Sequence, residues 1–376
     1  MKKRNNLLQK LMLLTALLAL MQTTELSAQK TTTYGTTAGT LGIRNSNFGF
    51  EAGKNSESTA YNNTFVGSES GPLNTTGRNN TFLGAYSGFY GTTDSFSTCV
   101  GSVAGRYPGT LNTFIGPFTG FHSSAKSMNV FVGSYAGYKA FGNNNIYIGH
   151  EAGKGQVADN SGYDNVFVGY QSGSSNTTGG SNTFIGSTSG SSNLTGAGNT
   201  YIGNNSGSGA TGSGNIFIGN EAGAFANTYS NTLLIENSTQ AVPLIYGDFA
   251  ADKVGINTTS VPNGYTLGVK GKLITEEVKV QLTSSGAWPD YVFQPAYKLR
   301  PLAEVEIHIK EKGHLPEVPS AADIKKNQGY ELGAMDATLL KKVEELTLYA
   351  IELEKQVKML KEEIVPKLNQ LEKQFK

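Results

Sequence analysis

A short segment that recurs over about half of the chain limits, more than any other feature, what this sequence can fold into. One copy reads Asn-Thr-Phe-Val-Gly-Ser-Glu-Ser-Gly at residues 63–71, and related copies lie between residues 47 and 223. The central glycines of successive copies are 15 to 20 residues apart, most often 17. Self-similarity at a fixed period indicates stacked units that cannot bury their apolar faces alone. This period is too short for a pair of helices and predicts one coil of a parallel β-solenoid.

The apolar centre of each copy predicts a short β-strand. β-branched and aromatic residues closed by a glycine are typical of a strand that ends at a turn. Side chains alternate between the two faces of a strand, so the central residues of all copies share one face. We expect these residues to form a structural ladder inside the coils. They are Phe65, Phe82, Cys99, Phe114, Phe131, Tyr147, Phe167, Phe184, Tyr201 and Phe217.

The two neighbours of each ladder residue are apolar or β-branched as well. The positions equivalent to Thr64 and Val66 carry only Thr, Val, Ile or Leu in the ten full copies. A strand with one solvated face should alternate apolar with polar residues. We therefore expect both faces to be buried, one inside the coil and the other against a second chain. Gly67 and Gly71, which tolerate positive φ, are expected at the corner after the strand.

The repeat pattern Asn-x-(Phe/Tyr)-(Val/Ile)-Gly-x-x-(Ala/Ser)-Gly resembles the head repeats of trimeric autotransporter adhesins of the YadA-like type. The resemblance covers about half of the chain and ten full repeats. It implies that the head is a left-handed parallel β-roll and that three chains form one trimer. It also implies that the second apolar face of the strands is the trimer interface.

The first 28 residues predict a signal peptide. Residues 1–4 are basic, residues 11–21 form an apolar core too short to span a membrane, and residues 26–28 provide a cleavage site. No later apolar run is long enough to cross a membrane, so we expect no transmembrane segment. These features predict an exported protein, placed in the extracellular space or on the outer-membrane surface of a Gram-negative bacterium.

Composition separates the repeats from the C-terminal part of the chain. The repeat region is almost uncharged, whereas Lys and Glu concentrate in the last hundred residues. The formal net charge of +1 argues against a nucleic-acid partner. The shift in composition predicts a mainly β protein with a helical C-terminal part. We divide the chain into a signal peptide (1–28), a polar lead-in (29–46), a β-roll repeat head (47–237), a short-strand junction (238–285), an α-rich connector (286–335) and a coiled-coil stalk (336–376).

Residues 231–235 lack the strand-ending glycine and predict the closing coil of the head. Further short strands are expected at 242–246, 254–256, 266–269 and 278–280. In the connector, Pro301 and Gly313 follow the preference for proline at the start of a helix and glycine after its end, although Ile307 also allows a strand. Ser320 with Asp323 predicts the cap of a second helix that ends at Gly329.

From Leu339 onward the apolar period becomes 3.5, which predicts a coiled coil. The expected seam residues are Leu339, Val343, Leu346, Ala350, Leu353, Val357, Leu360 and Ile364. Pro366 should kink or end this helix. Leu348, Tyr349 and Ile351 lie off the seam, and we expect the connector to cover them.

Segments 254–259, 288–293, 314–316 and 339–349 resemble the C-terminal region of tail-fibre-like surface proteins of Bacteroidota. In those proteins the segment that 254–259 resembles is a junction that links a β shaft to a C-terminal helical segment.

No motif in the chain predicts catalysis. Residues 207–212 match Gly-x-Gly-x-x-Gly, but a repeat strand follows them where a dinucleotide site needs a helix. The four histidines lack metal-ligand spacing, and the single cysteine, Cys99, rules out a disulfide framework. Ser320 is not part of the Ser-Asp-x-x-x-Lys type of motif found in self-cleaving chaperone-of-endosialidase domains. We therefore assign no catalytic, cofactor-binding or metal-ligating residue.

The sequence thus predicts a non-catalytic homotrimeric fibre protein that serves as an adhesin or as an envelope structural protein. Its partners are further copies of itself and an unidentified ligand on a host, on a cell surface or in a matrix. Two alternatives remain open: a tail-fibre-like component of a phage-derived apparatus, and a self-processing fibre similar to the chaperone-of-endosialidase proteins.

Overall fold

The computed structural model describes residues 32–35, 38–39, 42–122, 127–155, 158–226, 228–281 and 288–374. The predicted signal peptide, residues 1–28, lies outside the described residues. The chain forms two compact units, Met1–Leu273 and Ile274–Lys376, and each is described by itself.

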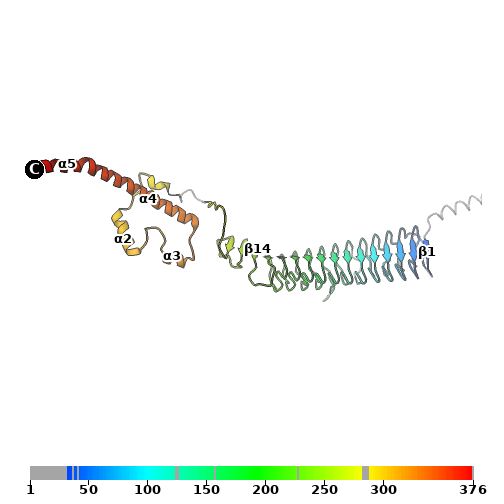
Figure 1. The fold of residues 1–376 in the computed structure, drawn as a ribbon. Helices are drawn as coiled ribbons and strands as arrows, with labels where there is room; N and C mark the ends of the chain where they lie inside the picture. The colour runs from blue at the N-terminus through cyan, green and yellow to red at the C-terminus, as the bar shows by residue number, and fades with distance from the viewer. Residues whose placement is uncertain are drawn as a thin grey trace, which may run out of the picture. The chain divides into compact units, whose positions relative to one another are not determined.

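The first unit contains a 16-stranded sheet whose strands follow one another in sequence order (Figure 1). From β1 to β13 every strand pairs in parallel with the next, at one strand per coil, so this part is a β-solenoid. The strands are β1 (Thr32–Tyr34), β2 (Ser46–Phe48), β3 (Thr64–Val66), β4 (Thr81–Leu83), β5 (Thr98–Val100), β6 (Thr113–Ile115), β7 (Val130–Val132), β8 (Ile146–Ile148), β9 (Val166–Val168), β10 (Thr183–Ile185), β11 (Thr200–Ile202), β12 (Ile216–Ile218) and β13 (Thr232–Ile235). The repeat therefore sets the pairing, because each copy supplies one strand.

The interior of the solenoid is built on rings stacked from coil to coil. Phe131 pairs with Phe114 on one side and with Tyr147 on the other. Its ring centroid lies 5.1 Å from that of Phe114 and 4.7 Å from that of Tyr147. Parallel, in-register pairing places identical positions one above another, which allows this stacking.

Buried asparagines form a second ladder, directly before most of the repeat strands; Ser97 takes this position before β5. The backbone N–H of Asn80 donates to Oδ1 of Asn63 over 3.0 Å, and that of Asn129 donates to Oδ1 of Asn112 over 2.8 Å. The side-chain amide of Asn63 donates to the carbonyl of Gly77 over 2.8 Å, across the same coil. These bonds give the buried amides the partners that they need away from water. Each asparagine thereby links one coil to the next.

Two glycines per coil are required by the tight corner that follows each strand. Gly84 has φ 135°, and a Cβ added there would lie 2.4 Å from the carbonyl oxygen of Gly101 in the next coil. Gly88 has φ 62°, and its Cβ would lie 2.3 Å from the ring of Phe82. Only glycine combines these φ values with such close approach.

The solenoid ends at β13, as the loss of the glycine at residues 231–235 predicted. The strand β13 pairs antiparallel with β14 (Ile245–Asp248), which pairs antiparallel with β15 (Lys253–Ile256). The strand β16 (Leu267–Val269) returns to parallel pairing. The strand expected at residues 278–280 does not form: the segment is exposed, and among the described residues no neighbouring strand binds its backbone groups.

The second unit is helical. It contains the 3₁₀ turn η3 (Pro289–Phe293), α2 (Leu302–Lys312), α3 (Ala321–Lys326), α4 (Leu332–Met359), the π-helical turn η4 (Leu360–Ile364) and α5 (Val365–Gln374). The helix α2 follows Pro301 and ends at Gly313 in the left-handed region, so the expected helix is confirmed over the strand. The helix α3 has the predicted cap, in which Ser320 and Asp323 bond each other's backbone N–H over 3.1 Å.

The helix does not end at Pro366, contrary to one of the two outcomes expected there. Proline lacks an N–H and its ring clashes with the carbonyl four residues earlier in an α-helix. Here η4 precedes the proline, and Val365 bonds the carbonyl of Leu360, five residues back. Just before Pro366 the hydrogen bonds of the π-helical turn span five residues instead of the four of an α-helix. The chain then continues as α5.

Candidate functional site

The ten ladder residues are buried and belong to the architecture of the solenoid. Each lies at the centre of one of the strands β3 to β12, with at most 1% of its surface exposed. Cys99 occupies the same slot as the rings, and burial raises the pKa of its thiol. None of these side chains is available to a ligand.

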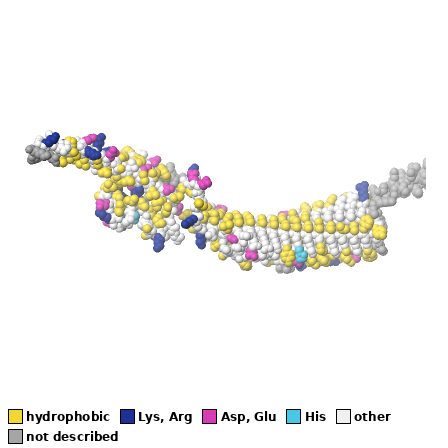
Figure 2. Space-filling view, in the orientation of Figure 1, with side chains coloured by type: hydrophobic (Ala, Val, Ile, Leu, Met, Phe, Trp, Pro, Cys, Tyr) yellow, Lys and Arg dark blue, Asp and Glu magenta, His cyan; other side chains and the backbone are white. Residues whose placement is uncertain are grey.

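The opposite face of the same strands, which we expected to be buried against a second chain, is exposed in the single chain. Residues at the position of Val66 form a continuous apolar row, which we call the outer ridge. Leu83, Ile115, Ile148, Ile185, Ile202 and Ile218 of this row are 37 to 45% exposed. Figure 2 shows a hydrophobic band of this kind running along the solenoid. No part of the chain that the structure describes covers it.

The predicted seam is also exposed. All eight residues from Leu339 to Ile364 lie on the solvent side of α4 and η4, with Leu346 at 65% and Leu353 at 62%. The side chains that a coiled coil would bury are therefore exposed to solvent. No helix within the described ranges packs on them.

The connector covers part of the off-seam side of α4. Val292 of η3 is buried, and η3 packs on α4. Tyr349 is half-buried and donates its hydroxyl to the carbonyl of Arg300. Ile351 is 44% exposed, so the expectation that the connector covers it is wrong. Ile351 lies further along α4, towards its C-terminal end, than Tyr349, which contacts the connector.

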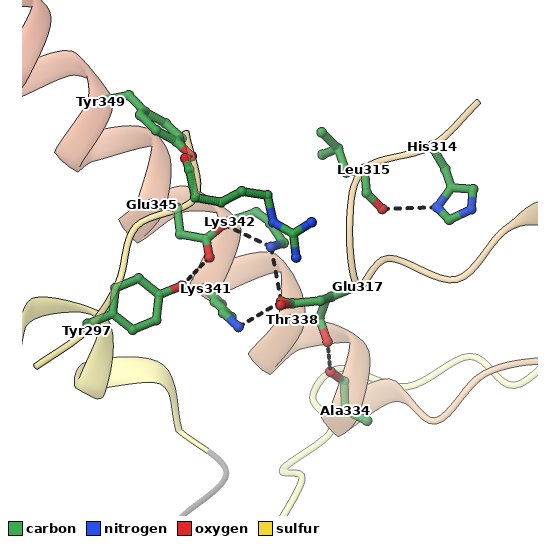
Figure 3. A network of polar contacts seen from close by, with 11 residues as sticks. Tyr297, His314, Leu315, Glu317, Ala334, Thr338, Lys341, Lys342, Glu345 and Tyr349 are labelled. Carbon is green, nitrogen blue, oxygen red and sulfur yellow. Dashed lines mark hydrogen bonds and ion pairs between the residues drawn. The ribbon is translucent and has the colours of Figure 1, made fainter. Parts of the chain in front are cut away.

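A polar network fixes the connector to α4 (Figure 3). The carboxylate of Glu317 lies 2.7 Å from Nζ of Lys341 and 3.1 Å from Nζ of Lys342. Lys342 also pairs with Glu345 at 2.8 Å, and Glu345 accepts a hydrogen bond from the hydroxyl of Tyr297. These contacts place two separate connector segments on one side of the helix.

The electrostatics of this network follow from its geometry. Burial opposes ionisation of Glu317, but the hydrogen bonds from Lys341 and Lys342 outweigh it and lower the pKa of the carboxyl from 4.5. Burial, and then the hydrogen bond to Glu345, raise the pKa of the Tyr297 phenol. At neutral pH the Glu317 carboxyl is thus charged and the Tyr297 phenol is neutral.

Residues of the connector and of the seam line an open apolar groove of about 580 Å³. Leu302, Val305 and Leu315 come from the connector, and Leu339, Val343 and Leu346 are seam residues. The first part of the seam therefore shares one apolar surface with the connector.

The other residues that the sequence analysis weighed as possible site residues belong to turns and helix caps. Gly207, in the Gly-x-Gly-x-x-Gly match, lies at a solenoid corner between β11 and β12, at φ 58°. Ser320 is the N-cap of α3. Within the described ranges no group of His, Cys, Asp or Glu could hold a metal ion, and no described helix has the length and hydrophobicity to cross a membrane.

A second group of aromatic residues was missed by the sequence analysis. It lies outside the coils, on the corners that follow the strands β4 to β9. We call it the corner cluster, and it comprises the outward side chains at residues 86–90, 106–107, 118–122, 135–139, 150–154 and 170. Figure 2 shows histidine side chains among hydrophobic ones along the lower edge of the solenoid, away from the hydrophobic band. The signal was the series of aromatic residues directly after the repeat glycines, which is densest in the middle copies.

Comparison with known protein families, with curated proteins and with solved structures found no match to this chain. Its function is therefore argued from the surfaces that it exposes.

Proposed function

We propose that the protein is a non-catalytic, homotrimeric fibre protein that is exported to the cell surface or the extracellular space and acts as an adhesin or as an envelope structural protein. The outer ridge is the observation that carries this proposal. It is an apolar row that continues through the repeat strands and has no cover within the described residues.

The physical argument rests on the cost of leaving this ridge in water. Soluble monomers rarely expose contiguous apolar patches of more than a few hundred Å². Each buried Å² of apolar surface stabilises an assembly by about 25 cal/mol. A partner with the same repeat offers the same row at the same spacing, so a further copy of this chain is complementary to the ridge along its whole length.

The exposed seam of the second unit favours the same partner. Eight seam residues are presented on one helix, and a coiled coil buries such residues against identical helices. Valine at a with leucine at d favours two strands in isolated coiled coils, whereas the resemblance of the repeats to YadA-like heads favours three chains and a left-handed roll. The repeats carry the outer ridge, which is a longer apolar surface than the seam. We therefore follow the resemblance of the repeats and propose three chains.

Two features support a non-catalytic role over a self-processing fibre. Ser320 is held by Asp323 in a helix cap, with its Oγ 2.6 Å from the Asp323 carboxylate. The charged groups around Glu317 are used in ion pairs and hydrogen bonds that link the connector to α4. The intact mass of the purified protein tests this alternative, since a cut near Ser320 would support self-processing.

A pair of matched lysine substitutions tests the ridge as the assembly surface. Ile148→Lys places a charge at the centre of the ridge, and Ser192→Lys places the same charge on an exposed corner outside it. Desolvating an unpaired lysine costs several kcal/mol, so Ile148→Lys should lower the native mass to that of one chain. Ser192→Lys should leave the trimer intact. Equal masses for both variants would show that the ridge is not the interface.

A further inference from the structure

We propose that the corner cluster binds a linear acidic polysaccharide, a chain of uronate-type sugars laid along the solenoid axis. This inference names the ligand of the proposed adhesive role and rests on that role. It does not use the ridge or the seam.

The corner cluster is one continuous surface. Tyr86 contacts Phe89, and Phe89 contacts Tyr90. Arg106 lies over the rings of Tyr90 and Phe121, at 4.9 and 5.0 Å, and so joins the two halves of the cluster.

The second half continues the chain of contacts across later coils. Phe121 stacks on Tyr138 at 5.1 Å, and Tyr138 contacts Tyr135. Tyr135 contacts His150, which stacks on Tyr170 at 5.6 Å. The cluster thus extends over several successive coils, which at about 4.8 Å per coil gives a strip fit for an extended polymer.

The later coils of the same solenoid show that these rings are not needed for stacking. At the positions equivalent to Tyr86 and Tyr135, the later coils carry Thr188 and Asn205. Their backbone N–H groups still bond the preceding coil, at 2.7 and 2.9 Å. The aromatic residues therefore add a surface to a corner that forms without them.

The stacked geometry determines which atoms the cluster offers. The planes of Phe121 and Tyr138 are 3° apart, and those of Phe118 and Tyr135 are 8° apart. In these two pairs ring faces are used within the stack, which leaves the ring edges for a ligand. Ring edges carry positive partial charge, so they favour oxygen-rich and anionic groups.

The charged side chains of the cluster are mostly positive: Arg106, Lys139 and Lys154 are cations, and Glu151 is a carboxylate. Among the described residues, neither Arg106 nor Lys139 is in an ion pair, while Lys154 is paired with Glu151 at 2.6 Å. Burial, and then the positive charges of Arg106 and Lys139, lower the pKa of His122, which Asp159 opposes only in part. An arginine without a carboxylate partner is suited to the carboxylates of a ligand.

Two other linear anions fit less well. Single-stranded nucleic acid is held by bases stacked on open aromatic faces, whereas Phe118, Phe121, Tyr135 and Tyr138 use ring faces to stack on one another. An acidic peptide added as a strand needs free backbone groups, but the backbone N–H groups of Tyr86, Phe118 and Tyr135 already bond the preceding coil. A polyuronate needs neither, because its carboxylates and hydroxyls contact side chains.

The test is calorimetric titration of the whole protein with oligosaccharides of alginate, a 1,4-linked polyuronate. Arg106→Gln should weaken binding about tenfold to hundredfold, as expected for loss of hydrogen bonds to a charged group. Arg78→Gln is the matched control, because Arg78 lies over Tyr61 at 5.5 Å and bonds its hydroxyl, away from the cluster. It should leave the affinity unchanged. Lys139→Gln serves as a second variant should Arg106→Gln lower the thermal stability.

Binding should weaken as salt is raised, and neutral cello-oligosaccharides should bind more weakly than alginate. The proposal is overturned by a lack of alginate binding, by equal binding in Arg106→Gln and Arg78→Gln, or by tighter binding of a single-stranded oligonucleotide. A trimer that binds no acidic oligosaccharide would refute the ligand alone. A monomer that binds it would refute the trimer alone.

Discussion

Removal of one ring from the interior ladder tests the energetics of the solenoid. Phe131 is fully buried, with Phe114 and Tyr147 stacked on its two faces. Phe131→Ala deletes the ring and leaves a cavity, because the strands on either side hold the backbone of the coil in place. Truncation of a buried phenylalanine costs about 3–5 kcal/mol, and the two ring contacts place this site in the upper part of that range.

Phe225→Ala is the matched control for this experiment, because Phe225 is 77% exposed. An exposed substitution of this kind should change the free energy of unfolding by no more than about 0.5 kcal/mol. Urea unfolding followed by circular dichroism, at one fixed protein concentration, measures both variants. Equal midpoints for Phe131→Ala and Phe225→Ala would refute the interior position of the ladder and with it the stacking argument.

Three single residues allow further tests. Cys99 is buried and its pKa is raised, so a thiol reagent should react with it only after unfolding, and stoichiometric reaction in native buffer would contradict this. Gly88→Ala should destabilise the protein by more than about 1 kcal/mol, measured by urea unfolding, since its φ is 62° and Phe82 occupies the Cβ position. The pKa of Glu317 is lowered from 4.5 in the folded state, so its contribution to stability is present above pH 4.5 and is lost as pH falls through the folded value. Thermal unfolding of Glu317→Gln should therefore depend less on pH below 4.5 than that of the unchanged protein, and identical profiles would argue against the network.

Local sequence rules predicted the parts of the fold that depend on neighbouring residues. The alternation around Phe131 indicated which strand face is interior, and Pro301 with Gly313 marked both ends of α2. The capping pair of Ser320 and Asp323 marked the start of α3. These signals act within a few residues, so they can be recognised in one sequence.

Features that depend on contacts between coils were harder to predict. The asparagine ladder and the corner cluster arise because residues about 17 apart lie one above another, as Phe121 and Tyr138 do. The helix continued past Pro366 because a π-helical turn precedes the proline, and no residue type marks such a turn. The outer ridge shows a different limit, since its pattern predicted a second buried face and the single chain leaves that face exposed.

The native mass of the purified, unmodified protein tests the central claim most directly. Multi-angle light scattering reports this mass without reference to shape. The proposed assembly predicts three times the mass of one chain, with the outer ridge and the seam both buried. A mass equal to one chain would contradict the account, because the exposed apolar row would then have no partner to explain it.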